Sequence, residues 1–77
     1  MVKVIIEECE SRKKIETKMP VIPKIGEKAY CCFIGLGWDF YSVLNIVYIF
    51  NKENKFTHVE IDVVDPEVWH SLKDQIK

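Results

Sequence analysis

The sequence has little of what marks secreted or metal-binding domains. There are three cysteines, an odd number, and no two of them have Cys-x-x-Cys spacing, so neither a disulfide framework nor a metal site is predicted. The first ten residues, MVKVIIEECE, lack the basic stretch, apolar run and small-residue cleavage site of a secretory signal. We therefore expect a reducing, cytoplasmic compartment in which the thiols stay free.

An excess of charge of one sign is also lacking. The net charge is −1, which argues against a strong overall attraction to nucleic acid or anionic lipid. With 77 residues, 48% hydrophobic and 30% charged, the chain has the composition of one ordinary globular domain spanning residues 1–77. A domain of this size is near the lower limit for building its own core, which leaves stabilisation by a partner, including a second copy, open.

Charge is almost absent from the middle of the chain, because Asp39 is the single charged residue between Tyr30 and Phe50. The run is long enough for a membrane helix, but a carboxylate near the bilayer centre costs about 2.5–3.5 kcal/mol. Its β-branched and aromatic residues suit a pleated sheet, and Gly35 and Gly37 interrupt it. We expect two strands of a folded core, not a membrane span.

The hydrophobic pattern predicts five strands and one helix. Alternation of apolar and polar residues, with proline and glycine at the breaks, places strands at about 2–8, 14–19, 28–34, 40–50 and 55–64. In the last strand we expect Thr57, Val59, Ile61 and Val63 to face inward. Asp65 followed by Pro66 and Glu67 has the features of a helix start, and the apolar spacing continues to Ile76, so the helix is expected over 66–76.

These elements predict a mainly β (α+β) fold: a strongly bent five-stranded antiparallel sheet or a small barrel, with the C-terminal helix covering an open end. The segment VIPKIGEKAY resembles the Pro-x-x-Gly-acidic-x-x-aromatic segment of several SH3-like small barrels. The long hairpin 40–64 is similar to their central strands. The resemblance implies a binding role, to peptides, nucleic acid or partner subunits, more often than catalysis.

Cysteine and histidine are the residues with the greatest chemical potential in this chain. Cys31 and Cys32 are adjacent on a strand and should point to opposite faces, so they should not both bind one metal ion. A thiol nucleophile with His58 as its base is conceivable with Cys9 or Cys31, but apolar surroundings would raise the thiol pKa of Cys31 and Cys32 instead of lowering it. We expect no enzyme activity, no cofactor and no metal.

The segment GLGWDF carries the candidate interface. Trp38 is expected at a loop tip, where it either folds back to plug one end of the sheet, the interpretation we favour, or is exposed as an interface anchor. The predicted interface residues are Trp38, Asp39 and Tyr41, as anchor, polar orienting group and flanking contact. The first strand, residues 2–6, is expected to be an exposed sheet edge able to pair with a partner. Together these features predict a non-catalytic protein–protein interaction module, with self-association as one form of it.

The alternative hypothesis is a nucleic-acid-binding small barrel. Arg12, Lys13 and Lys14 form a basic cluster in the first turn, and small barrels can stack bases on exposed aromatic rings. Against this, we expect most of the nine aromatic residues to be needed for the core. Glu60 and Asp62 would also repel phosphate from the outer face of the fifth strand.

Overall fold

The computed structural model describes residues 1–74, and the sheet accounts for most of them. The strands are β1 (Val2–Glu8), β2 (Lys14–Met19), β3 (Lys28–Phe33), β4 (Gly37–Phe50) and β5 (Phe56–Val64), followed by helix α1 (Pro66–Lys73). The mainly β fold with five strands and one helix is confirmed. The predicted helix end at 76, and Ile76 on its apolar face, lie outside the described residues.

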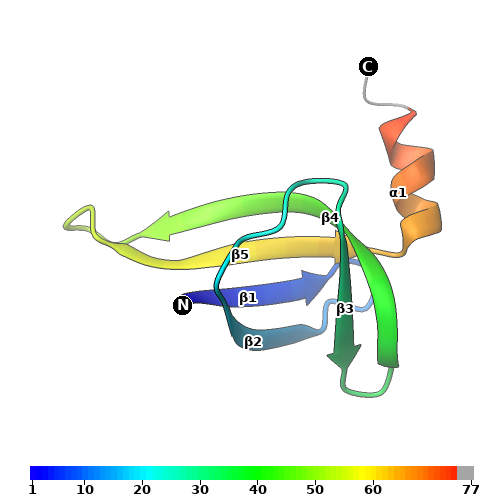
Figure 1. Ribbon diagram of the computed structural model, residues 1–77, viewed down its shortest axis with the longest axis horizontal. Helices are drawn as coiled ribbons and strands as arrows, with labels where there is room; N and C mark the ends of the chain where they lie inside the picture. Colours follow the sequence, from blue (N-terminus) through cyan, green and yellow to red (C-terminus); the bar gives the residue numbers. More distant parts are fainter. Residues whose placement is uncertain (75–77) are drawn as a thin grey trace.

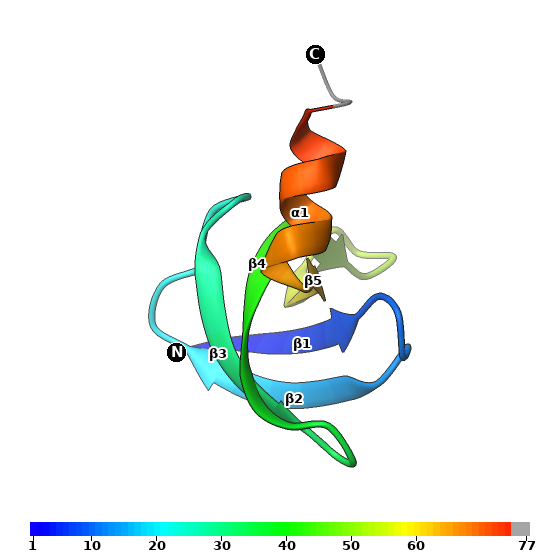
Figure 2. The same ribbon diagram turned by 90° about the vertical axis from the view of Figure 1, so that its right-hand side faces the viewer.

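The five strands form one sheet in the order β2-β1-β5-β4-β3 (Figure 1). Each strand pairs antiparallel with a sequence neighbour, in the β1–β2 and β3–β4–β5 units. The two units are joined by β1 and β5, which run parallel, Val4 beside Val59 and Ile6 beside Ile61. The sheet is therefore mixed, not wholly antiparallel as the alternation pattern had suggested, and it curls until it is nearly closed (Figures 1 and 2).

The core lies on the inner face of this curled sheet. Alternate residues of β1 and β5 fill it: Val4, Ile6, Val59, Ile61 and Val63 are each at most 2% exposed. The inward alternation predicted for Val59, Ile61 and Val63 is confirmed, whereas Thr57, predicted to face inward with them, is exposed. From the other unit come Cys31, Phe33, Tyr41 and Val43, with the Phe33 and Tyr41 rings edge to face at 5.2 Å.

A tight turn at Ile34–Leu36 divides the uncharged run into β3 and β4. The Leu36 N–H donates to the Phe33 carbonyl at 2.9 Å, and Gly35 has φ +85°. This is the third position of a β-turn, where a type II turn requires positive φ and therefore favours glycine. Because the turn ends at Leu36, β4 begins at Gly37, three residues earlier than predicted. Trp38 consequently lies in a strand, and its placement at a loop tip was wrong.

Helix α1 begins as the sequence indicates. The Asp65 side chain accepts a hydrogen bond from the Glu67 N–H at 2.9 Å, and Pro66 occupies the first turn. The helix contacts β4, and Trp69 packs against Gly26 in the linker between β2 and β3. None of the described helix residues is fully buried, and α1 projects away from the sheet (Figures 1 and 2). It does not cover the open side of the sheet.

The uncharged run from Tyr30 to Phe50 forms strands, as expected, and not a helix. Residues 30–50 form most of β3, the turn and β4. Within residues 1–74 there is no helix with the length and apolar character needed to cross a membrane.

Candidate functional site: an open seam between two edge strands

The sheet ends at β2 on one side and at β3 on the other, and these two edges face each other. We call the gap between them the seam. Strand β1, predicted to be an exposed edge, lies between β2 and β5, so that prediction was wrong. The alternation of apolar residues in β1 arises from its central position in the sheet, where it already pairs with two strands.

Hydrogen bonds at the β1–β2 turn show which backbone groups of β2 reach the seam. The Glu8 N–H donates to the Lys13 carbonyl at 2.9 Å, in the same register that pairs Ile6 with Ile15. In an antiparallel ladder, bonded and non-bonded pairs alternate. Ile15, Thr17 and Met19 therefore bond to β1. Their neighbours Lys14, Glu16 and Lys18 direct their backbone N–H and C=O groups into the seam.

The same reasoning applies to β3. The Val43 N–H donates to the Glu27 carbonyl at 2.9 Å, in the register that pairs Ala29 with Tyr41. Ala29, Cys31 and Phe33 therefore bond to β4, and Lys28, Tyr30 and Cys32 direct their backbone groups into the seam. Both edges thus offer three residues whose backbone groups have no strand beside them, the arrangement that strand addition uses.

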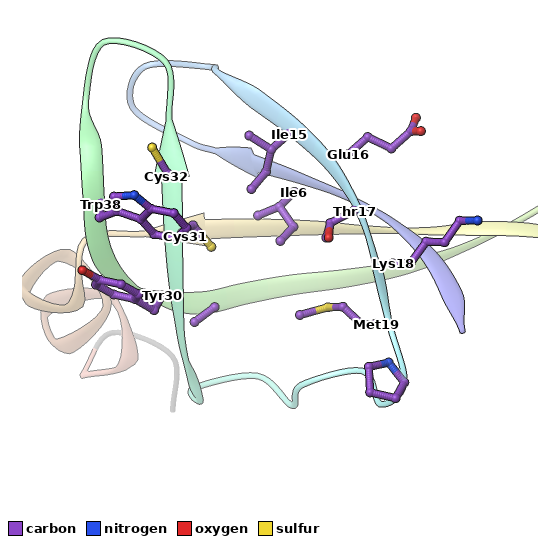
Figure 3. A pocket seen from close by; sticks show the side chains of 12 residues that line it. Ile6, Ile15, Glu16, Thr17, Lys18, Met19, Tyr30, Cys31, Cys32 and Trp38 are labelled. Carbon is purple, nitrogen blue, oxygen red and sulfur yellow. The ribbon is translucent and has the colours of Figure 1, made fainter.

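A cavity of about 500 Å³ lies beneath the seam (Figure 3). Its lining is mostly apolar and comes from both edges and from β1, chiefly Ile6, Ile15, Met19, Ala29 and Cys31. Ile15 and Met19 point into it from β2, while Cys31 does so from β3 (Figure 3). The volume is in the range of small-ligand and peptide pockets.

The seam is closed at both ends. At one end the Lys13 ammonium donates to the Ile34 carbonyl and so ties the β1–β2 turn to the β3–β4 turn. At the other end the linker, residues 20–27, crosses from β2 to β3. Between these ends the two strands diverge toward the linker (Figure 3). The opening is therefore a wedge with fixed ends.

Three exposed aromatic side chains stand beside the seam on the outer face of β3 and β4. We call Tyr30, Trp38 and Phe40 the aromatic row; they are 57%, 64% and 55% exposed. The Tyr30 ring is stacked on Trp38 at 5.2 Å and tilted against Phe40 at 4.7 Å. A contiguous apolar patch on a small protein marks an interaction surface more often than a chance exposure.

The predicted interface trio is only partly brought together. Trp38 is exposed, so the plug interpretation was wrong, and its role as an interface anchor stays a prediction. Asp39 is exposed, but its Oδ1 accepts the Phe40 N–H at 2.8 Å, and strand alternation places it on the face opposite Trp38. Tyr41 is only 7% exposed and belongs to the core, so it cannot make the predicted flanking contact.

Sequence reasoning missed Tyr30 and Phe40 as surface residues because it expected most of the aromatic residues to be needed for the core. The signal that could have found them is the register of a short hairpin around Gly35. Once Phe33 is placed opposite Gly37, Tyr30 falls opposite Phe40 and Cys32 opposite Trp38. These two pairs then share a face. A further aromatic pair is exposed where the β4–β5 hairpin extends past the core, with Phe50 and Phe56 edge to face at 5.8 Å.

The expectation that most aromatic residues are needed for the core was wrong. Only Phe33 and Tyr41 are buried, Trp69 is half-buried, and the remaining six of nine are exposed. The core is built instead mainly from β-branched residues. Exposed rings are what both of the interaction hypotheses require.

The side chains of the basic turn are each engaged by a neighbour. Arg12 Nε lies 2.9 Å from Glu7 Oε2, and Lys14 Nζ lies 3.6 Å from Glu7 Oε1. Lys13 is engaged by the Ile34 carbonyl. Arg12 also adopts a left-handed backbone with φ +64°, which places it in a tight turn. The three residues thus make contacts that support the turn, while Arg12 and Lys14 remain exposed to solvent.

Glu8, a buried carboxylate, organises the same turn. Its Oε2 accepts the Glu10 N–H at 3.0 Å and its Oε1 accepts the Ser11 N–H at 2.8 Å. Burial by itself raises the pKa of Glu8, but these bonds and the Ser11 hydroxyl lower it, and the net pKa lies below its ordinary value. Glu8 is therefore a structural anion beneath one end of the seam.

The thiols and histidines do not form a reactive pair. Burial raises the pKa of Cys31, and burial, followed by Asp62 and Glu8, raises the pKa of Cys9. His58 Nε2 lies 3.0 Å from Glu60 Oε2 and its Nδ1 lies 2.9 Å from Thr57 Oγ1, so both ring nitrogens already have partners. Among residues 1–74 no three His, Cys, Asp or Glu side chains cluster as a metal site would need.

Comparisons with known proteins add no assignment to this geometry. No protein-family model matches the chain, no curated protein matches it, and no solved structure matches it. The resemblance to SH3-like small barrels stays a prediction.

Proposed function

We propose that this protein is a non-catalytic protein–protein interaction module that holds an extended segment of a partner protein in the seam between β2 and β3. One observation carries the proposal: two strand edges without hydrogen-bonded neighbours, β2 and β3, lie above one apolar cavity of about 500 Å³. Strand addition gains affinity from backbone hydrogen bonds and selectivity from pockets for alternate side chains. The seam offers both within one small surface.

The aromatic row supports the same function. Aromatic residues, tryptophan and tyrosine above all, are enriched among those that dominate binding energy at protein interfaces. Trp38 and Tyr30 are next to the cavity and line it in part, so a segment in the seam would pass beside them. A cytoplasmic setting fits the three free thiols, Cys9, Cys31 and Cys32.

A site-specific photo-crosslinker tests this function. A benzoylphenylalanine residue replaces Tyr30 at the seam or, as the matched control, Tyr48, an equally exposed tyrosine on β4 outside the seam (57% and 56% exposed). The protein is irradiated in native extract with and without nuclease. We expect protein adducts at position 30 that survive nuclease and are absent at position 48.

The Glu16→Pro variant completes the experiment. Proline removes the seam-facing N–H of residue 16 without removing a bond to β1, so it should block strand addition and spare the fold. Adducts at position 30 should fall at least about tenfold, which corresponds to about 1.4 kcal/mol of binding free energy. Adducts that are unchanged by Glu16→Pro, or equal at positions 30 and 48, would contradict the proposal.

A second candidate function, binding of single-stranded nucleic acid, is favoured by one observation. The aromatic row is exposed, which base stacking requires. The ion pairs of Arg12 and Lys14 with Glu7 and the net charge of −1 count against it. Adducts at position 30 that disappear with nuclease, together with a salt-dependent affinity for oligothymidine, would favour this function over the first.

A further inference from the structure

The side chains around the seam determine which residue types a bound segment should have. A strand placed between β2 and β3 alternates its side chains between the cavity and the solvent, with period two. Inward and outward positions contact different side chains of the protein. The residue type favoured at each position follows from those side chains. The inference rests on the proposed function, since it names the chemistry of the segment.

Positions facing inward meet an apolar floor. The nearest side chains are Ile6 from β1, Ile15 and Met19 from β2, and Ala29 and Cys31 from β3. Ile15, Met19 and Ala29 are only half-buried, although they pack against the core. An unpaired polar group placed here would lose its hydration without a partner. Alternate residues of the segment should therefore be aliphatic.

Positions facing outward meet a positively charged rim. Lys18 near the end of β2 and Lys28 at the start of β3 both belong to the linker end of the seam. Within residues 1–74 neither has an acidic side chain at ion-pair distance, whereas Glu16, the acidic residue of this rim, already lies 3.5 Å from Lys3. Lys14 is taken by Glu7. An acidic residue at this end of the segment would meet two unpaired lysines.

The lining of the opening by both strands favours a single strand over a whole second molecule. The cavity is lined by both edges at once, and the sheet curls so that continuing it beyond β2 leads toward β3. A strand that brings its own neighbouring strand would compete with β3 for the same space. The fixed ends, the Lys13–Ile34 contact and the linker, also limit the length. At about 3.3 Å per residue, about five residues match the seam-facing span from Lys14 to Lys18.

We infer that the seam binds an extended segment of about five residues in which aliphatic residues alternate with polar ones, the outward residue at the linker end being acidic and lying between Lys18 and Lys28. Opposite charges across neighbouring strands stabilise pairing, and like charges oppose it. The segment is thus defined by the alternation of its aliphatic residues and by the negative charge at its linker end. These two properties distinguish it from a peptide that binds through hydrophobicity alone.

Three capped synthetic peptides test the inference by NMR titration of the whole chain. They are VDIEV, its charge-reversed form VKIKV, and VVIDE, which has the composition of the first without its alternation. We expect VDIEV to shift the backbone N–H signals of Glu16, Lys18, Tyr30 and Cys32 in a saturable way. VKIKV and VVIDE should bind at least about tenfold more weakly, a difference of about 1.4 kcal/mol.

A charge-exchange variant makes the test specific. In the double variant Lys18→Glu, Lys28→Glu the preference should reverse, with VKIKV now binding more tightly than VDIEV. The matched control, Lys52→Glu with Lys55→Glu in the β4–β5 turn, makes the same change in net charge outside the seam and should leave the preference unchanged. Both pairs of lysines are exposed, so both variants should fold.

The outcomes separate this inference from the proposed function. Equal binding of all three peptides at the seam would overturn the segment chemistry and leave strand addition standing. If the same N–H signals shift when the protein alone is concentrated, the occupant of the seam is a second copy of the protein. That result would also overturn the segment chemistry. No shift at the seam with any peptide would overturn the inference, whereas the crosslinking result with Glu16→Pro decides the proposed function on its own.

Discussion

At the scale of single residues, Glu8 links pH to stability. Its lowered pKa means that the folded state favours the carboxylate, so its contribution is present above the ordinary value of 4.5 and is lost as pH falls through the lower folded-state pKa. We expect Glu8→Gln to lower the free energy of unfolding at pH 7 by about 1–3 kcal/mol, because the amide oxygen can accept only one of the two backbone N–H groups and the amide nitrogen, a donor, faces the other. The difference from wild type should shrink steadily below pH 4.5 in urea titrations. A difference that is constant from about pH 7 to about pH 3 would contradict the assigned role.

Trp38 and Phe33 are close in sequence, but their removal should affect stability very differently. Trp38→Ala removes a ring that is 64% exposed and should cost less than about 1 kcal/mol. Phe33→Ala empties a site that is 1% exposed and should cost about 3–5 kcal/mol. Urea unfolding of both variants measures the contrast. In a Trp69→Phe background, Trp38 should emit at long wavelength and be quenched by iodide; blue-shifted, protected emission would restore the plug interpretation.

These two residues also show where sequence reasoning stops. Hydrophobicity alone placed Phe33 and Trp38 in one uncharged run, and nothing local separates a ring that faces the core from one that faces solvent. The separation comes from hairpin register, which the positive φ angles of Gly35 and Gly37 set. The same limit explains Tyr41: it is three residues from Trp38, on the other face of the same strand.

At the scale of elements, the strand and helix bounds were largely predictable because they depend on local chemistry. Prolines, Asp65 and the alternation in residues 59–63 fix ends and faces without knowledge of the rest of the chain. Strand order was not predictable in this way. Pairing of β1 with β5 joins residues more than fifty positions apart, and the same alternation suits an edge strand and a central strand equally well. The seam follows from strand order, so the sequence could not reveal it.

The contact between α1 and the linker gives a prediction at this scale. Gly26 has φ +91°, and a Cβ there would lie 3.3 Å from Trp69 Cζ2. Gly37 has φ +76°, but a Cβ at that position would have no heavy atom within 4 Å. Both alanine substitutions incur left-handed backbone strain of about 1–2 kcal/mol. We expect Gly26→Ala to cost measurably more than Gly37→Ala in thermal unfolding, because only the former also displaces Trp69.

The Trp69 ring provides the control for that comparison. In a Trp69→Ala background the crowding is gone, so the two glycine substitutions should become equally costly. If Gly26→Ala stays the more harmful change there, the excess arises from the linker backbone and not from its contact with the helix.

At the scale of the whole molecule, the sheet is nearly closed, and its stability and its function depend on where it stays open. Because β2 is an edge strand, neighbouring residues differ in their backbone hydrogen bonds. The Glu16 N–H faces the seam, and the Thr17 N–H bonds to β1. We expect Glu16→Pro to change the free energy of unfolding by less than about 1 kcal/mol, since proline is tolerated where no ladder bond is lost. Thr17→Pro removes a ladder bond, leaves its acceptor on β1 without a partner, and should cost about 1–3 kcal/mol.

Urea unfolding of the two variants, with hydrogen exchange of β1 as a second measurement, decides between this topology and one with β1 at the edge. In the observed order, Thr17→Pro should also speed exchange at Val4 and Ile6, whose N–H groups bond to β2, while Glu16→Pro should leave them protected. Equal loss of stability in both variants would mean that β2 has a strand on either side. The seam would then be filled by the chain itself, and neither a partner segment nor its acidic residue could enter it.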